Sequence, residues 1–385
     1  MIYLDHAATT RPAAEVVEAM LPYLTTHYGN ASSLYSLGRE SRKAIEQTRE
    51  LAAAFFGCRP QEILFTSGGS ESDNLALRGV MWALREKGDH LITTEVEHHA
   101  VLYSARALER QGFRVTLLKP DRQGRISVDQ VAGAITERTT LISVMHGNNE
   151  VGSLQPIAGI GRLARERGIL FHTDAVQTVG QLPLNVREIP CDLLSMSAHK
   201  VYGPKGTGLL YRRIGVPLVS QISGGDQEYN QRAGTENVAG IVGLGAALEL
   251  AFAALQDGEP ERSRQLRDRL IQGVLAALPD AELTGPREDR LPNHASFRFP
   301  HIEGEPLLLN LDMRGICGSS GAACATGEIE PSHVLLALGY TRSEAHGALR
   351  LTLGRENTAE QVEEVIRVLP SLVQSLRDLR RPAPP

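Results

Sequence analysis

The stretch DLLSMSAHKVYGPKGTG, residues Asp192–Gly208, decides the fold. A run with strand character ends in Ser-Ala-His-Lys and is followed by a Gly-Pro-Lys-Gly turn. This pattern is typical of a buried strand that stops at the carboxyl edge of an α/β sheet, where such sheets bind ligands. Lys200 stands at that edge. A lysine amine there can form a Schiff base with a carbonyl cofactor, although most lysines are solvated surface residues.

Short β-rich runs alternate with amphipathic helical segments on both sides of this stretch, from about Ser41 to Arg213. The alternation predicts an α/β fold with a mostly parallel sheet flanked by helices. The predicted strands are residues 62–66, 89–94, 113–118, 139–145, 168–174, 192–197 and 206–212.

A second region follows a polar stretch at residues 257–260 and begins with a charged helix over 261–278. It has further strands, predicted at 295–300 and 347–354. We therefore predict a large domain of residues 13–257. A smaller α+β domain would contain residues 1–12 and 258–385.

Composition limits the possible functions of the 385-residue chain. A net charge of −5 gives no basic surface for nucleic acid. Four cysteines without a CxxC pair suit a reducing compartment, and the start MIYLDHAATT lacks signal-peptide features, so we expect a cytoplasmic protein. The apolar stretch Val238–Leu255 is long enough to span a membrane, but Glu249 and many small residues favour a helix packed inside a globular protein.

Two further segments indicate pyridoxal phosphate as the cofactor. Asp174 follows a strand that reads as buried, and Gln177 lies one turn further on. A carboxylate there caps a helix in many proteins, but it is also the counter-ion that a pyridinium nitrogen needs. The segment FTSGGSESDNLAL, from Phe65, offers a strand, a glycine and serine turn and a helix, which suits a phosphate.

Polar residues after other strands complete the candidate site. His98 and His99 could stack on a pyridine ring, start a helix or bind a metal; no cysteine or carboxylate recurs at zinc spacing, so we predict no metal. Asn149 could cap a helix or hold a ligand carboxylate. Arg350 lies in an apolar strand, where either a substrate carboxylate or a protein acid could pair with it.

Cys324 stands in ICGSSGAACATGEIEPSHVLLAL, residues 316–338, among small residues that offer a core little to pack against. The composition predicts a loop, with Pro331 opening the helix that follows. By itself the thiol could be an exposed residue without function.

Long motifs in one order carry a family resemblance from Tyr3 to Asn357. They include YLDHAATT, YGNASSLYSLGRES, FTSGGSESDN, TEVEHHAV, MHGNNEVG, HTDAVQ, SAHKVYGPKG, RAGTENV and SSGAACATGEIEPSHVL. The chain resembles the cysteine desulfurases of the NifS/IscS type, in the class V aminotransferase branch of the fold-type I pyridoxal-phosphate enzymes. The resemblance implies a fold-type I transferase with a large cofactor domain and a smaller domain that carries the catalytic cysteine.

The resemblance also implies roles for individual residues. Lys200 would bind pyridoxal phosphate covalently and Asp174 would pair with the ring nitrogen. Gln177 would bond the ring hydroxyl, and His98 would stack on the ring and take part in catalysis. The phosphate would be bound by Gly69, Ser70, Ser197 and His199, and by Thr235 reaching over from the partner subunit of a homodimer.

The implied reaction removes sulfur from L-cysteine and yields L-alanine. Asn149 and Arg350 would hold the substrate carboxylate, and Cys324 would take the sulfur as a persulfide. An acceptor protein would receive it for iron–sulfur cluster assembly or for thiolation of tRNA or a cofactor. A selenocysteine lyase or cysteine lyase of the same fold, or a catalytically silent sulfur carrier or scaffold, are the alternatives.

The chain departs from the family pattern in a few places. It reads GAAC at 321–324, where Gly-Ser-Ala-Cys is common, and GGDQEYN at 224–230, where Gly-Gly-Gly-Gln-Glu-Arg-Gly is common. Tyr35 replaces a histidine that is usual in its motif. The sequence also ends at residue 385 without the extension with which relatives hold the iron–sulfur scaffold, so we expect weaker binding to such a scaffold.

Overall fold

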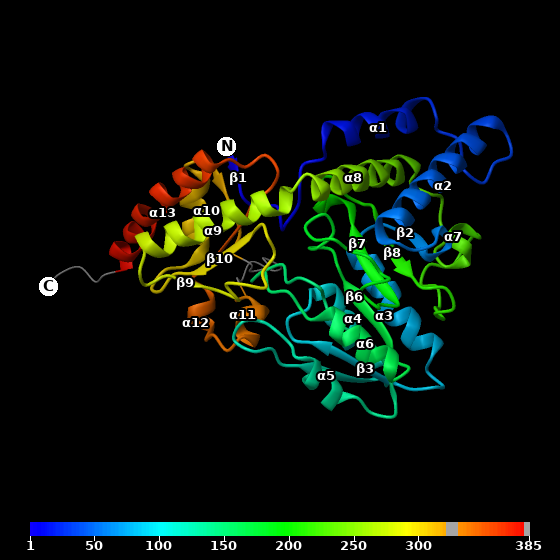
Figure 1. The fold of residues 1–385 in the computed structure, drawn as a ribbon, viewed down its shortest axis with the longest axis horizontal. Coiled ribbons are helices and arrows are strands. Elements are labelled where there is room, and N and C mark those ends of the chain that lie inside the picture. Colours follow the sequence, from blue (N-terminus) through cyan, green and yellow to red (C-terminus); the bar gives the residue numbers. More distant parts are fainter. Residues whose placement is uncertain (321–329, 381–385) are drawn as a thin grey trace.

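A seven-stranded sheet forms the centre of the larger part of the molecule (Figure 1). The computed structural model describes residues 1–320 and 330–380. The strand order is β2 (Ile63–Thr66), β8 (Gly208–Arg212), β7 (Leu193–Ser197), β6 (Leu170–Asp174), β5 (Thr139–Ser143), β3 (His90–Thr94) and β4 (Arg114–Leu118). Among these seven strands only β8 runs opposite to its neighbours, which confirms the predicted mostly parallel sheet.

Helices cover both faces of this sheet because its strands are apolar on both sides. Leu193 and Leu194 are consecutive in β7 yet enter different cores, as the twofold repeat of a strand requires. One core is shared with α3 (Gly69–Ala83) and α4 (His99–Arg110). The other is shared with α2 (Ser36–Phe56), α5 (Val128–Ala134), α6 (Ile157–Glu166) and α8 (Val238–Gln256), while α1 (Ala14–Thr25) packs on α8.

The smaller part is built on a three-stranded antiparallel sheet in the order β12 (Ala348–Thr352), β10 (His294–Arg298) and β9 (Glu282–Leu283). A second pair of strands joins the chain start to it, because β1 (Ile2–Tyr3) pairs in parallel with β11 (Ile316–Cys317). The accompanying helices are α9 (Glu259–Ala277), α10 (Gly304–Asp312), α11 (His333–Ala337), α12 (Arg342–Ala345) and α13 (Ala359–Arg380).

The main hydrophobic cores of the two parts are separate, although a small core joins Val96 and Val151 of the larger part to residues 334–348 of the smaller part. The core of the smaller part combines Leu4 with residues between Leu270 and Val373, whereas the cores around the large sheet use residues between Ala13 and Leu248. This separation supports the predicted domain division, whose boundaries stay a prediction.

Several element ends differ from those that the sequence predicts. The helix predicted after the glycine and serine turn of FTSGGSESDNLAL begins earlier, because α3 starts at Gly69 within that turn. Pro331 does not open the helix after the Cys324 segment. Ser332 caps that helix, since its hydroxyl accepts a hydrogen bond from the Leu335 amide at 3.1 Å, and α11 begins at His333.

Within the described residues, α8 is the one helix long and apolar enough to cross a membrane. Half of it is buried inside the protein, against α1 and α2. Its glycines allow close packing, because a side chain at Gly243 or Gly245 would meet Met20 or Thr48 within about 3 Å. The helix therefore packs as the sequence predicted, as part of a protein core.

Candidate active site

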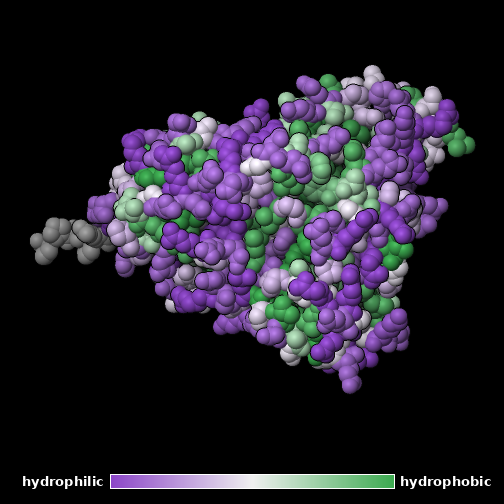
Figure 2. Space-filling view, in the orientation of Figure 1, coloured by the Kyte–Doolittle hydropathy of each residue, from purple (hydrophilic) through white to green (hydrophobic). Residues whose placement is uncertain are grey.

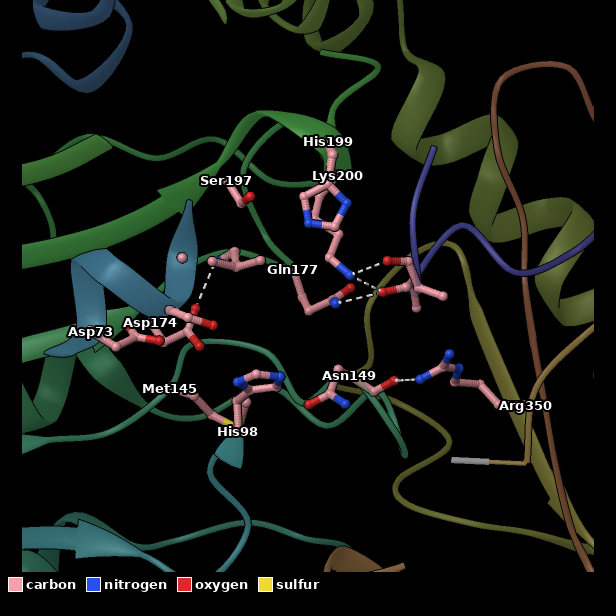
Figure 3. A pocket seen from close by; sticks show the side chains of 15 residues that line it. Asp73, His98, Met145, Asn149, Asp174, Gln177, Ser197, His199, Lys200 and Arg350 are labelled. Carbon is pink, nitrogen blue, oxygen red and sulfur yellow. Dashed lines mark hydrogen bonds between the residues drawn. The ribbon is translucent and has the colours of Figure 1, made fainter. Parts of the chain in front are cut away.

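Strand ends and loops from both parts of the molecule meet at one cavity of about 400 Å³ (Figure 3). Its walls bring together almost all of the site residues that the sequence predicts. The lining residues are Ala7, Ala8, Gly69, Ser70, Asp73, His98, Met145, Asn149, Asp174, Val176, Gln177, Ser197, His199, Lys200 and Arg350. Of the predicted residues, Cys324 lies outside the described part of the chain, and Thr235 is exposed and does not line this cavity.

Lys200 enters the cavity from the short helical turn η2 (Ala198–Lys200), which follows β7 directly. Its Nζ donates hydrogen bonds to the carbonyls of Ala7 and Ala8, the latter at 2.6 Å (Figure 3). Burial, together with the positive charge of the nearby Arg350, lowers its pKa from 10.5 to about 8. A large fraction of the protein molecules therefore has an uncharged Lys200 amine at mildly alkaline pH, and a nucleophilic amine must be uncharged.

Asp174 is the last residue of β6, and its Oδ1 accepts a hydrogen bond from the Val176 amide at 2.9 Å. Burial raises its pKa to about 6. Asp73 of α3 lies close to it and is more deeply buried, so its pKa is raised well above the usual range. Asp174 is thus the carboxylate that ionises first, and a cation in the cavity would stabilise that charge.

The first turn of α3 forms another part of the wall. No side chain caps this helix, so the amides of its first turn can bind an anion. Gly68 has φ +148°, and a side chain at Gly69 would meet Val176 at 2.7 Å. Glycines therefore keep the space between the helix start and β6 open, which suits a phosphate group.

Two neutral histidines line the cavity. His98 caps α4, and its Nδ1 accepts a hydrogen bond from the Ala100 amide at 3.1 Å, so Nε2 carries the ring proton. Burial lowers the pKa of His98 to about 4, with a further contribution from His99. Burial likewise lowers the pKa of His199 to about 4, and its Nδ1 lies 3.1 Å from the Thr9 hydroxyl.

Gln177 and Ser197 come from the ends of adjacent strands. Gln177 follows β6, and its Nε2 donates to the carbonyl of Ala7 at 3.0 Å, so its amide is fixed beside Lys200. Ser197 is the last residue of β7 and lies 4% exposed in the wall.

Arg350 reaches the cavity from β12 of the smaller sheet. Its NH2 donates to Asp5 at 2.8 Å, and its NH1 donates to the carbonyl of Asn149 at 2.9 Å. Its Nε, also buried, has no hydrogen-bond partner. A protein acid therefore does pair with Arg350, and a buried donor of the same guanidinium remains available to a ligand.

Two acids of this region, the partly buried Asp5 and the buried Asp73, were not predicted as site residues. Asp5 and Asp73 both belong to motifs that the sequence analysis quotes, YLDHAATT and FTSGGSESDN. Their positions in those motifs were the available signal, since each carboxylate stands near a glycine- or alanine-rich turn. The contacts of both residues depend on distant parts of the chain, which a motif does not show.

The thiols that the structure describes do not suit nucleophilic catalysis. Burial raises the pKa of Cys58 to about 12, and it raises the pKa of Cys191 and Cys317 as well. None of the three lines the cavity. In the same described residues, no group of three or more histidine, cysteine or acidic side chains could hold a metal ion.

These features fit pyridoxal phosphate. A lysine amine with a lowered pKa, a buried carboxylate and an uncapped helix start face one cavity, and they match its aldehyde, its ring nitrogen and its phosphate. The fold and the site together define a pyridoxal-phosphate-dependent enzyme.

Comparisons with known proteins agree with this class. The family model described as "Aminotransferase class-V" matches residues 2–365. A protein named cysteine desulfurase IscS, from Clostridium botulinum strain Hall, is 50% identical over 380 residues, 98% of this chain and 96% of the relative.

Solved structures give the same result. A structure titled "NifS-like protein" superposes with a TM-score of 0.91 at 36% identity, over 97% of this chain and 100% of the other. A structure titled "SspA in complex with cysteine" has a TM-score of 0.80 at 38% identity, over 92% and 99% of the two chains. The chain belongs to the class V aminotransferase family of pyridoxal-phosphate enzymes, and within it to the cysteine desulfurases.

Proposed function

We propose that this protein is a cysteine desulfurase that converts L-cysteine to L-alanine and carries the sulfur as a persulfide on Cys324. The observation that carries the proposal is the cavity itself. It combines the Lys200 amine and the Asp174 carboxylate with an arginine from a different sheet. The chain is also 50% identical in sequence to a protein named cysteine desulfurase.

Lys200, Asp174, Gln177 and His98 act on the cofactor and on the substrate's Cα. When bound, pyridoxal phosphate withdraws electrons from that carbon. Lys200 Nζ, with its lowered pKa, accepts the Cα proton, and Asp174 keeps the ring nitrogen protonated by supplying a buried negative charge. Gln177 would hold the ring hydroxyl, and His98, which is neutral, would lie against the ring without adding charge to the site.

The phosphate is held where α3 begins. Gly69 and Ser70 supply backbone amides of the first turn, and Ser197 and His199 approach from the end of β7. Thr235 is exposed in one chain, and the loop that carries it is tied to α3 by Arg232, which binds Glu71 at 2.8 Å. An exposed hydroxyl in this position suits the partner role given to Thr235, in which it binds the phosphate of the other subunit.

Asn149 and Arg350 hold the substrate carboxylate. Arg350 has a buried Nε without a partner, and the Asn149 side chain lines the same wall (Figure 3). The substrate carboxylate competes with Asp5 for the guanidinium. Because the guanidinium is already buried beside Asp5, substrate binding does not add the cost of removing it from water.

Sulfur transfer uses Cys324. Its thiolate attacks the sulfur of cysteine, the bond between that sulfur and the substrate's Cβ breaks, and the bonding electrons stay with the carbon skeleton that becomes alanine. One substrate thiol and one enzyme thiol thus give alanine and an enzyme persulfide. The raised pKa values of Cys58, Cys191 and Cys317 support the assignment of this role to the remaining cysteine.

The persulfide sulfur passes to an acceptor protein for iron–sulfur cluster assembly or for thiolation of tRNA or a cofactor, and the enzyme works as a cytoplasmic homodimer. Exposed apolar residues support association with a second copy. Val17, Leu21 and Leu24, at helical spacing on α1, are more than half exposed, and so is Phe252 of α8. Figure 2 shows apolar residues gathered over α8.

The experiment that tests the proposal measures alanine and protein-bound sulfur together. Purified protein should be yellow and lose that colour with borohydride, and cysteine should yield alanine and persulfide in equal amounts during the first turnover. Selenocysteine is offered in competition. Alanine without protein-bound sulfur, or turnover of selenocysteine alone, would refute the proposal in favour of a lyase.

A further inference from the structure

The start of α11 is tied to the large part of the molecule by side chains rather than by a sheet. Ser332 is 3% exposed, and its hydroxyl donates a hydrogen bond to Oε2 of Glu150. The Ser332 hydroxyl oxygen also accepts a hydrogen bond from the Leu335 amide at 3.1 Å, and this bond caps the helix. Glu150 belongs to the loop after β5, so one buried carboxylate joins that loop to α11.

His333 adds a second contact of the same kind. Its Nε2 donates to the carbonyl of Glu97 at 2.9 Å, since a carbonyl can only accept, and its Nδ1 faces Glu150 Oε1 at 3.9 Å. Its ring also lies 4.5 Å from that of His99. Glu97 and His99 flank His98 in the sequence, so these contacts tie α11 to the loop that carries the cavity histidine.

An apolar layer lies beneath these polar contacts. Val96 and Val151, from the two loops, share a small hydrophobic core with Val334, Leu335 and Leu338 of the α11 region. The layer excludes water from the carboxylate above it, and the partners of Glu150 are thereby fixed in a low-dielectric environment.

The loop that carries Glu150 is itself held in place. Asn148 Oδ1 accepts hydrogen bonds from the amides of Glu150 and Val151 at 2.9 and 2.8 Å, and its Nδ2 donates to the carbonyl of Val96 at 2.9 Å. The backbone of Glu150 is therefore held in place next to Asn149, and α11 packs against the Glu150 side chain.

We propose that Glu150 is a positioning residue for sulfur transfer. Through His333 and through the cap Ser332, eight residues after Cys324, it fixes the start of α11 beside the loops that carry His98 and Asn149. The inference rests on the proposed role of Cys324. On the other side of that cysteine, Ser319 pairs through its backbone with Arg350, at 3.0 Å from its amide to the Arg350 carbonyl. The attachment before the cysteine is thus a backbone pairing. The attachment after it combines the Glu150 contacts with the His333 bond to the Glu97 carbonyl and with the apolar layer.

The contact also depends on pH. Burial raises the pKa of Glu150 from 4.5 to about 7, while Ser332, Arg350 of β12 and His99 of α4 oppose that rise, and His333 is the titratable group that faces it from α11. The folded protein, in which Glu150 is buried, therefore holds this proton more tightly than the unfolded chain does. The stability that Glu150 contributes is fully present below about pH 4.5 and is lost as the pH rises through 7.

The first test is hydrogen exchange of the α11 amides, residues 333–337, in the cofactor-loaded protein at pH 6 and pH 8.5, corrected for intrinsic exchange rates. Glu150→Ala and Ser332→Ala should exchange about tenfold faster than the parent at both pH values. Glu150→Gln keeps an acceptor and cannot ionise, so its protection should not change with pH. Glu166→Ala, an exposed acid at the end of α6, is the control and should match the parent.

The second test follows labelled sulfur from cysteine onto Cys324 in a single turnover. Glu150→Ala should slow this step about tenfold. The cysteine concentration that gives half of the spectral change on binding should stay within about twofold of the parent value. Glu150→Gln should recover most of the rate of sulfur transfer. Parent-like exchange and parent-like sulfur transfer in Glu150→Ala would overturn the inference. If the parent itself put no sulfur on Cys324, the proposed function would fail instead, and the exchange experiment would still decide whether Glu150 docks α11.

Discussion

The two walls of the cavity are built in different ways. Lys200, Asp174 and Ser197 project from the carboxyl ends of adjacent strands, so the hydrogen bonds of the seven-stranded sheet fix their spacing. The opposite wall joins Arg350 of the smaller sheet to Asp5, which stands 345 positions earlier in the chain. The first wall is a property of one sheet, whereas the second depends on how the chain start and the smaller part meet.

This difference divides the proposed chemistry. In the proposed function, the sheet wall would hold the cofactor and the arginine wall would hold the substrate carboxylate. Changes in the sheet wall should therefore reduce turnover at every cysteine concentration, and changes in the arginine wall should raise the cysteine concentration that the enzyme needs.

The largest effect is expected for Lys200→Ala. Without its amine the enzyme loses both the covalent link to the cofactor and the base for the Cα proton, so alanine production should fall at least about 10³-fold. Lys205→Ala, an exposed lysine of the same turn, is the matched control and should keep parent activity. If Lys200→Ala formed alanine at nearly the parent rate, the residues of the sheet wall would not carry out the proposed chemistry.

Asp174→Asn should come next, with a loss of about 10²-fold in turnover and little change in apparent cysteine affinity. The amide keeps the acceptor for the Val176 amide but cannot supply the negative charge that holds a proton on the ring nitrogen. Thermal unfolding of the cofactor-free protein should change little, because no buried charge is left unpaired. A selective loss of cysteine affinity would contradict the division between the walls.

Arg350→Lys should act on the other side of the comparison. A lysine cannot reproduce the guanidinium fork, so the apparent KM for cysteine should rise about tenfold or more while the cofactor spectrum stays the same. Steady-state titration with cysteine measures this effect, with Arg355→Lys as the control. An unchanged KM would mean that Arg350 serves only its ion pair with Asp5.

The smallest expected effect is a shift in a pH profile. Cofactor-free protein should react with pyridoxal phosphate through the uncharged Lys200 amine, so the rate should rise with pH and level off above about pH 8, as the lowered pKa requires. Arg350→Gln removes a positive neighbour and should move the midpoint upward. A midpoint near 10.5 in the parent would show that Lys200 is solvated.

Much of the fold and of the sheet wall could be predicted from the sequence, because each motif combines a strand with the residues that follow it. SAHK places Lys200 after β7 and HTDAVQ places Asp174 at the end of β6, and parallel strands bring such ends together. The resemblance to a known family supplied the individual roles. Local patterns thus define the elements that carry the site.

The contacts across the two parts of the molecule could not be predicted in this way. The partner of Arg350 was left open between a substrate and a protein acid, since a strand pattern does not show what a distant segment brings to it. The cap at Ser332 was missed for a similar reason. Both proline and serine are common at the start of a helix, and only the structure shows that Ser332 is buried against Glu150 and serves as the cap.

The central claim is that Cys324, and none of the other three cysteines, receives the sulfur. The most direct measurement treats the cofactor-loaded protein with sulfur-labelled cysteine for one turnover and identifies the labelled peptide by mass spectrometry. The label should be found on Cys324 in an amount equal to the alanine released. Cys324→Ala should stay yellow and bind cysteine yet carry no label. Label on Cys317, or parent-rate turnover by Cys324→Ala, would contradict the account.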